Sequence, residues 1–146
     1  MKIRTMKETD YPQLYGLWMR CRGMGLNDVD DSALGIARYL RRNPSTCFVA
    51  EEDGAVLGAI MAGHDGRRGF IYHTAVDPDC RRRGIGSKLV DAALRALRDE
   101  GIAKAALVVF SRNEAGNAFW AHQGFTLRED LCYRNLALTE IRRMDT

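Results

Sequence analysis

The chain has 146 residues, which suits one domain with a sizeable core, and its 22 Lys and Arg against 19 Asp and Glu give a net charge of +3. This small excess gives no reason to expect nucleic acid as a partner, and the sequence has neither a signal-peptide core nor an apolar stretch long enough to cross a bilayer. The four cysteines have neither Cys-x-x-Cys spacing nor ligand spacing with the three histidines. We therefore expect a single cytoplasmic domain over residues 1–146, with reduced thiols, no metal and no membrane partner.

Two helices are predicted after the first strand. Residues 2–6 are strand-like, and a helix-start signal of Thr, Asp and Pro follows at residues 9–12. This helix ends at Gly23-Met24-Gly25. A second helix over residues 32–42 ends at Asn43-Pro44, because the residue before a proline avoids the helical conformation.

The middle of the chain predicts an antiparallel meander of three strands. Strand-like runs occupy residues 47–51, 55–62 and 70–76. Asp53-Gly54 joins the first two, since this dipeptide accepts the positive φ values that a tight hairpin turn needs. The glycine-rich residues 63–69 make the next turn, and Asp77-Pro78 closes the meander.

A basic turn with two glycines follows the meander. The run Arg81-Arg82-Arg83-Gly84-Ile85-Gly86-Ser87 leads into an amphipathic helix that ends at Glu100-Gly101. Glycines let the main chain approach a ligand closely, and the free N–H groups of a helix's first turn favour an anion. The arginines can add charge-assisted hydrogen bonds to phosphate oxygens. The pattern is typical of a pyrophosphate-binding turn.

The last third predicts one more strand, a helix and a hairpin. The apolar run 105–110 should lie parallel to the strand at 70–76, because a crossover helix connects them. Asn113 can cap a final helix that ends near Gln123-Gly124, and residues 125–128 with 132–138 should form a closing hairpin. The predicted fold is α/β with a mixed sheet of about six to seven strands and four helices.

These residues resemble the GCN5-related N-acetyltransferase (GNAT) family over nearly the whole chain. The family's phosphate signature is Gln or Arg, two residues, Gly, one residue, and Gly or Ala, which reads here Arg81-Arg82-Arg83-Gly84-Ile85-Gly86. A second family segment is similar to Asn113-Glu114-Ala115, Phe119-Trp120 and Gly124-Phe125. The similarity is greatest to small bacterial members related to the ribosomal-protein alanine acetyltransferases, and the turn at residues 63–69 resembles one found in an uncharacterised bacterial subgroup.

The resemblance implies acetyl-CoA as cosubstrate, with no metal, bound where two parallel strands splay apart. In the family, backbone amides of the basic turn hold the pyrophosphate, and the pantetheine arm lies along the preceding strand like an added strand. The resemblance assigns cofactor binding to Thr74, Ala75, Val76, Arg81, Arg82, Arg83, Gly84, Ile85, Gly86, Ser87, Asn113, Ala115 and Trp120. Asn113 as a simple helix N-cap, and Arg81 and Arg83 as a solvated basic turn, are the structural alternatives.

The family's usual catalytic side chains are replaced in this chain. Its proton donor, a Tyr of the second segment, is Trp120, whose indole is no acid at neutral pH and is better read as a core aromatic that lines the cofactor slot. Tyr133, on the last predicted strand, is a substitute donor. The family's basic Glu falls at Tyr72 or, in other members, at Val108.

Several side chains remain candidates for the base. His73 has suitable chemistry, but strand alternation directs its side chain to the face opposite Tyr72, and a structural role is the alternative. A water relay would need no side chain at the amine. The catalytic candidates are Tyr133, His73 and Tyr72, and further candidates for the base are His64, Asp65 and the acidic loop of Asp28, Asp30 and Asp31.

The leading functional hypothesis is an N-acetyltransferase that moves an acetyl group directly from acetyl-CoA to a primary amine in a ternary complex. The amine could belong to a protein N-terminus, a lysine or a small molecule, and the acidic loop either favours a cationic acceptor or is simply solvated. The alternative is a CoA-binding module without turnover. Nucleic-acid binding is disfavoured, because the arginine clusters are not interleaved with stacking aromatics. The resemblance also implies a homodimer as one oligomeric state.

Overall fold

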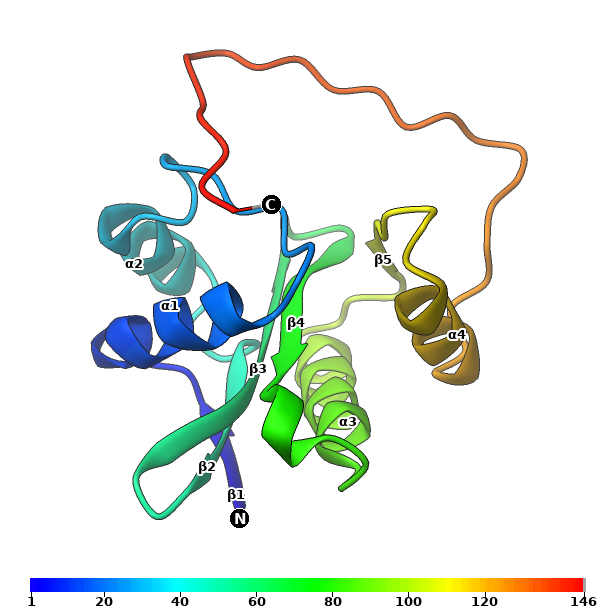
Figure 1. Cartoon of the computed structure of the whole chain (residues 1–146). Coiled ribbons are helices and arrows are strands. Elements are labelled where there is room, and N and C mark those ends of the chain that lie inside the picture. The colour runs from blue at the N-terminus through cyan, green and yellow to red at the C-terminus, as the bar shows by residue number, and fades with distance from the viewer. Residues whose placement is uncertain (146) are drawn as a thin grey trace.

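The computed structural model describes residues 1–145 and contains a five-stranded mixed sheet with helices on both faces (Figure 1). The strands, adjacent in chain order, are β1 (Lys2–Thr5), β2 (Phe48–Glu52), β3 (Ala55–His64), β4 (Gly69–Val76) and β5 (Ala105–Leu107). Strands β1 to β4 pair antiparallel, and β5 pairs parallel to β4. The helices are α1 (Tyr11–Arg20), α2 (Ala33–Arg42), α3 (Ile85–Asp99) and α4 (Glu114–His122), with short 3₁₀ turns at Glu8–Asp10 and Pro78–Cys80. The predicted mixed sheet and helices are confirmed.

The sheet is buried on both faces, with one hydrophobic core on each. Helices α1 and α2 cover the first face, where Leu14, Leu17, Trp18, Ile36 and Leu40 pack against Ala59 and Met61 of β3. Helix α3 covers the second face, where Leu89, Val90, Ala93 and Leu97 pack against Ile60, Ala62 and Ile71. The side chains of β3 point alternately into the two cores, and for this reason its sequence is a nearly continuous apolar run.

One local prediction is confirmed by the backbone, and the start of α2 shows a further local feature. Asp53 and Gly54 have φ of 51° and 79°, as the hairpin turn between β2 and β3 requires. Ser32 caps α2, since its hydroxyl accepts a hydrogen bond from the N–H of Gly35 at 3.0 Å. Both features depend only on residues that are neighbours in the sequence.

The predicted closing hairpin and the count of six to seven strands are wrong. Residues 126–142 contain no helix or strand and run as a long arc away from the sheet (Figure 1). Leu127, Leu136 and Leu138 are more than three-quarters exposed along this arc. The alternating pattern predicted strands, but a strand needs a partner edge to satisfy its backbone, and β5 ends at Leu107, earlier than its predicted end at residue 110.

The last described residues do not join the sheet but form hydrogen bonds with the loop after α1. Arg142 and Met144 exchange backbone hydrogen bonds with Asp28 and Leu26 at 2.9 Å. The carboxylate of Asp145 accepts from the N–H groups of Gly25 and Leu26 at 3.0 and 2.8 Å. These bonds hold the loop after α1 in place beside the sheet.

Candidate functional site

Strands β4 and β5 separate after three paired residues. Gly69, Phe70 and Ile71 pair with Ala105, Ala106 and Leu107, and from Tyr72 onward β4 has a partner strand on one side only. The N–H of Asp77 donates to Leu57 of β3 at 2.7 Å, so strand alternation turns the backbone groups of Thr74 and Val76 toward the free edge. The predicted splayed pair is confirmed, and its edge can accept an extended ligand as an added strand.

The basic turn presents an anion-binding backbone beyond the end of this free edge. Gly84 has φ of 74° and is the N-cap of α3, with no side-chain hydrogen bond to the helix. Arg82 has φ of 64°, so left-handed residues alternate with others in this turn. Such a turn points successive N–H groups into one concavity, and the uncapped first turn of α3 adds its own donors and dipole.

The three arginine side chains are not equally free to reach a ligand. Arg83 forms an ion pair with Glu52 at 2.7 Å, and Nε of Arg81 lies 3.4 Å from the carbonyl of Val76. Within residues 1–145, Arg82 has no carboxylate partner. The turn therefore offers an anion its backbone N–H groups first, and its arginine side chains are engaged to different degrees within the protein.

Helix α4 packs closely against the start of α3. A Cβ atom added to Gly86 would lie 3.1 Å from the ring of Phe119, and Gln123 donates to the hydroxyl of Ser87 at 2.9 Å. This close approach favours a small residue at position 86, and it brings the second family segment beside the basic turn. Ala115, in the first turn of α4, is exposed.

Asn113 and Trp120 both have structural roles in α4. The side chain of Asn113 accepts from the N–H of Gly116 at 2.9 Å, which confirms the helix N-cap. Trp120 packs edge-on between Phe119 and Phe125, at centroid distances of 5.0 and 5.2 Å. Trp120 is thus a partly buried aromatic that packs against the second core.

Replacing Trp120 with leucine is expected to lower the free energy of unfolding by about 2 kcal/mol, because both aromatic contacts are lost while part of the apolar volume stays. Trp120→Phe should cost less than about 1 kcal/mol. Chemical denaturation and acetyl-CoA titration of both variants check this. A fall in acetyl-CoA affinity for Trp120→Phe without a fall in stability would instead make the indole a cofactor contact.

A bulge in β4 places Tyr72 and His73 on the same face of the sheet. The register pairs Ile60 with Thr74 but Ala62 with Ile71, so both residues lie opposite Met61. Tyr72 contacts Tyr39 of α2, and His73 contacts Trp18 of α1. The expectation that alternation separates the two side chains is therefore wrong, because the extra residue breaks the period of two.

His73 is paired with a buried carboxylate from the loop between α1 and α2. Its Nε2 lies 2.6 Å from Oδ1 of Asp31, and Asp31 is 3% exposed. Oδ2 of Asp31 accepts from the N–H of Asn27 at 2.8 Å. The rings of Trp18 and His73 form a T-shaped pair, with their centroids 5.1 Å apart. The imidazole is thus fixed in position and orientation.

The two candidate tyrosines differ in their surroundings. Tyr72 is half-exposed at the split, and burial, with Tyr133 and Asp30 nearby, raises the pKa of its phenol. Tyr133 is 68% exposed and lies in the arc, outside any helix or strand. Val108, the other position of the family's Glu, is exposed just beyond β5. Of the two tyrosines, Tyr72 lies on β4 at the split.

The remaining candidates for the base are occupied elsewhere. His64 pairs with Glu100 at 2.9 Å, and Asp65 accepts from the N–H groups of Arg67 and Arg68, which lower the pKa of its carboxyl. These residues flank the β3–β4 turn, at the end of β4 where β5 is still paired. In the acidic loop, Asp28 accepts from the backbone of Arg142 and Asp30 from the side chain of Asn27. The loop is therefore held together internally.

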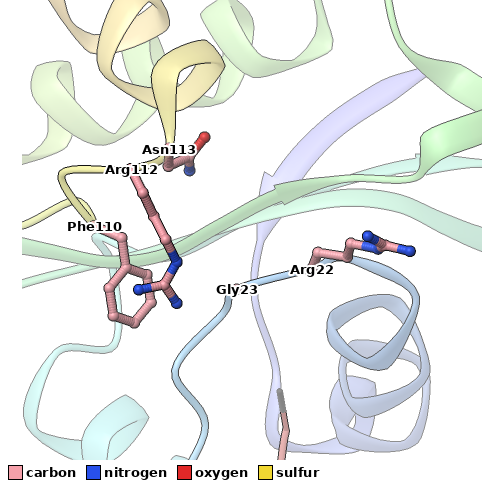
Figure 2. Close-up of a pocket in the computed structure, with 5 residues that line it drawn as sticks. All are labelled: Arg22, Gly23, Phe110, Arg112 and Asn113. Atoms are coloured by element: carbon pink, nitrogen blue, oxygen red, sulfur yellow. The ribbon is translucent and has the colours of Figure 1, made fainter.

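An open cavity of about 620 Å³ lies between the loop after α1 and the loop after β5, lined by Arg22, Gly23, Phe110, Arg112 and Asn113. Figure 2 shows Arg112 beside the ring of Phe110 and facing Gly23, whereas the side chain of Arg22 points away. The guanidinium of Arg112 lies 4.5 Å from the centre of that ring. None of the lining residues is acidic. Sequence analysis did not identify Arg22, Gly23, Phe110 or Arg112, since no local motif links two loops so far apart.

The comparisons with known proteins agree with this arrangement. The family model described as "Acetyltransferase (GNAT) family" matches residues 11–125. The chain belongs to this family. An acetyltransferase of Sodalis glossinidius is 37% identical over 115 residues, which cover 79% of this chain and 80% of the relative. One of Pectobacterium atrosepticum is 36% identical with the same coverage.

Solved structures of other proteins share the fold. Ard1 from Thermoplasma volcanium superposes with a TM-score of 0.78 at 25% identity, covering 87% of this chain and 83% of that one. The ribosomal-protein-S18-alanine N-acetyltransferase from Escherichia coli gives 0.71 at 24% identity, covering 86% and 77%. The PaiA N-acetyltransferase from Thermoplasma acidophilum, solved in complex with coenzyme A, gives 0.73 at 19% identity, covering 87% and 90%.

The protein is thus an acetyl-CoA-dependent N-acetyltransferase, and its residues fit this cosubstrate. The free edge of β4 has backbone groups that can bond to the arm of an elongated ligand. The left-handed turn before α3, which no side chain caps, has free N–H groups for the ligand's phosphates. Across residues 1–145, no group of three or more His, Cys, Asp or Glu is arranged to hold a metal ion. Over the same residues, no helix combines the length and apolar character needed to span a membrane.

Proposed function

We propose that this acetyltransferase, acting as one domain in the cytoplasm, transfers an acetyl group directly from acetyl-CoA to a primary amine while both substrates are bound. The observation that carries the proposal is the continuous path formed by the anion-binding turn and the free edge of β4. On this path, the amides from Arg82 to Ser87 bind the pyrophosphate. Thr74 and Val76 bind the pantetheine arm through their backbone groups, Ala75 lies between them with its backbone turned to β3, and Asn113 and Ala115 lie beside the arm.

The thiol that contacts the free edge of β4, at its Val76 end, gives no support to an acetyl-enzyme. An acetyl-enzyme would need a nucleophilic thiolate, and Cys21 is the cysteine that contacts the free edge, with its Sγ 3.6 Å from the carbonyl of Val76. Burial raises the pKa of this thiol, so it stays protonated at neutral pH. The amine is therefore expected to attack the thioester itself, with its position in the ternary complex supplying much of the rate.

The cavity between the loop after α1 and the loop after β5 favours one kind of acceptor over another. Arg112 stacks on Phe110, and Arg143 approaches the same ring at 5.6 Å, while no acidic side chain lines the cavity. A second cation on the acceptor would be repelled here, whereas an anionic or aromatic group beside the amine would find a partner. The acceptor is a protein N-terminus, a lysine or a small-molecule amine, and a neighbouring acidic group should improve it.

The proposed function is tested by measuring coenzyme A release and acetyl-CoA binding with a panel of amines. Peptides that differ only in Glu or Lys next to the reacting amine test the acceptor preference, and the Glu peptide is expected to have the higher kcat/KM. Tight binding of acetyl-CoA with no turnover on any amine would make the protein a CoA-binding module. A higher kcat/KM for the Lys peptide would contradict the preference for an acidic neighbour but not the proposed acetyl transfer.

Replacing Gly84 with alanine is expected to weaken acetyl-CoA binding roughly tenfold, because a Cβ atom disfavours the left-handed conformation that aims the N–H groups of the turn. Gly101 is the matched control, since it has φ of 79° at the other end of α3. Both alanine variants should lose similar stability in thermal unfolding, but calorimetry should find weaker binding for Gly84→Ala only. Equal affinities for the two variants would remove the turn from the binding site.

A further inference from the structure

We propose that His73, oriented by the buried carboxylate of Asp31, is the general base that takes the proton of the acceptor amine. This inference rests on the proposed acetyl transfer and adds a catalytic residue and a positioning residue to it. Neither matches the carboxylate that the family places at Tyr72 or Val108. The proposal follows from the bulge in β4, the pairing of His73 and the orientation of its ring.

The bulge places His73 where the cosubstrate's arm would end. Ile71 is the last residue of β4 that pairs with β5, so Tyr72 and His73 are the first residues on the free edge. The anion-binding turn lies beyond the other end of that edge, after Val76. An arm held at the turn and laid along the edge therefore points its reactive end toward Tyr72 and His73. Both side chains lie on the face covered by α1 and α2.

The pairing with Asp31 assigns the protons of the imidazole. A carboxylate only accepts hydrogen bonds, so the 2.6 Å contact places a hydrogen on Nε2 and leaves the lone pair on Nδ1. Within residues 1–145, Nδ1 has no hydrogen-bond partner and is not among the enclosed, unpartnered polar atoms. Nδ1 is therefore the nitrogen that can accept a proton from a substrate.

The environment of Asp31 also stabilises the charge that forms on the ring. Among the described residues, His73 is the only basic side chain that pairs with this buried carboxylate. When Nδ1 takes a proton, the imidazolium lies against a negative charge in a site where water screens little. The N–H of Asn27 and the ring of Trp18 hold the two partners in place, so little reorganisation is needed.

Two residues of β4, His73 and Tyr72, can carry out both proton transfers of the reaction. As the amine nitrogen bonds to the acetyl carbon, its proton moves to Nδ1 of His73, and the carbon–sulfur bond breaks with its electron pair on sulfur. The phenol of Tyr72 gives its proton to that sulfur and regains one, through water, from the imidazolium. Burial raises the pKa of this phenol, which therefore holds its proton at neutral pH until the sulfur needs it.

The test compares His73→Gln and Asp31→Asn with His64→Gln, the matched control, because His64 has the same kind of carboxylate contact but lies at the closed end of β4. His73→Gln is expected to lower kcat ~10² to 10³-fold, and Asp31→Asn at least ~10-fold, with acetyl-CoA affinity unchanged within about twofold. His64→Gln should keep the wild-type kcat. Added imidazole should restore part of the activity of His73→Ala.

A readout without turnover separates a catalytic from a structural role. Nitrogen-15 NMR of the ring should show His73 with its proton on Nε2 in the wild type and a mixture of tautomers in Asp31→Asn. If the wild type turns over and His73→Gln has the same kcat, His73 is not the general base, but the proposed acetyl transfer still stands. No turnover by the wild type on any amine would overturn both. If Asp31→Asn does not fold, His73→Gln and the imidazole rescue still decide the question.

Discussion

Gly35→Ala is expected to lower the free energy of unfolding by about 3 kcal/mol and to reduce acetyl transfer at the same time. Gly35 lies in the first turn of α2, where an added Cβ would overlap the backbone carbonyl oxygens of Val29 and Asp30 and lie 2.7 Å from the carbonyl carbon of Asp30. These atoms are main chain and cannot move aside as a flexible side chain can. The loop would shift and carry Asp31 away from His73. Urea denaturation and kcat measurements check both effects.

Gly16→Ala is the matched control for this result. Gly16 lies inside α1, and the nearest atom to its added Cβ is the guanidinium of Arg20, at an ordinary contact distance of 3.5 Å. Alanine is favoured over glycine inside a helix, so this variant should be unchanged or more stable by about 0.5–1 kcal/mol, with the wild-type kcat. Equal stability of the two variants would show that the loop before α2 yields to the extra methyl group.

Arg4→Leu is expected to cost about 3 kcal/mol of stability near neutral pH, because it leaves a buried carboxylate unpaired. Arg4 makes two hydrogen bonds to Asp10, at 2.9 and 2.8 Å, and also pairs with Glu51. Burial by itself would raise the pKa of Asp10, but the hydrogen bonds from Arg4 and from the N–H of Lys7 outweigh it, and the pKa is lowered. The ionised form of Asp10 is therefore the one that stabilises the fold.

The sign of this pKa shift predicts how the effect depends on pH. The stabilisation is complete above the pKa of an unfolded Asp, about 4, and is lost as pH falls through the lowered value in the folded protein. The difference between wild type and Arg4→Leu in urea denaturation should therefore shrink below about pH 4. Arg41→Leu, which breaks the exposed pair with Glu8, is the control and should stay within about 0.5 kcal/mol of wild type. A pH-independent difference would mean that Arg4 acts through packing alone.

The strand, turn and helix of the proposed cofactor site could be predicted from the sequence, because short-range geometry determines them. Glycines at the turn, a strand before it and an amphipathic helix after it are all local features, and the structure places them as the pattern indicated. His73 and Asp31 were each candidates for the base, but their pairing could not be predicted in the same way. Asp31 and His73 are 42 residues apart, and the cavity is lined by loops from opposite halves of the chain.

The sequence by itself determined the helices, the hairpin at Asp53-Gly54 and the glycine turn before α3, because capping, periodicity and the φ preferences of glycine act within a few residues. Only the tertiary structure decided where β5 ends, that residues 126–142 are not strands, and that His73 shares a face with Tyr72. A bulge belongs to a pair of strands, and a strand exists only where another offers its edge. These properties depend on partners that lie far away in the sequence.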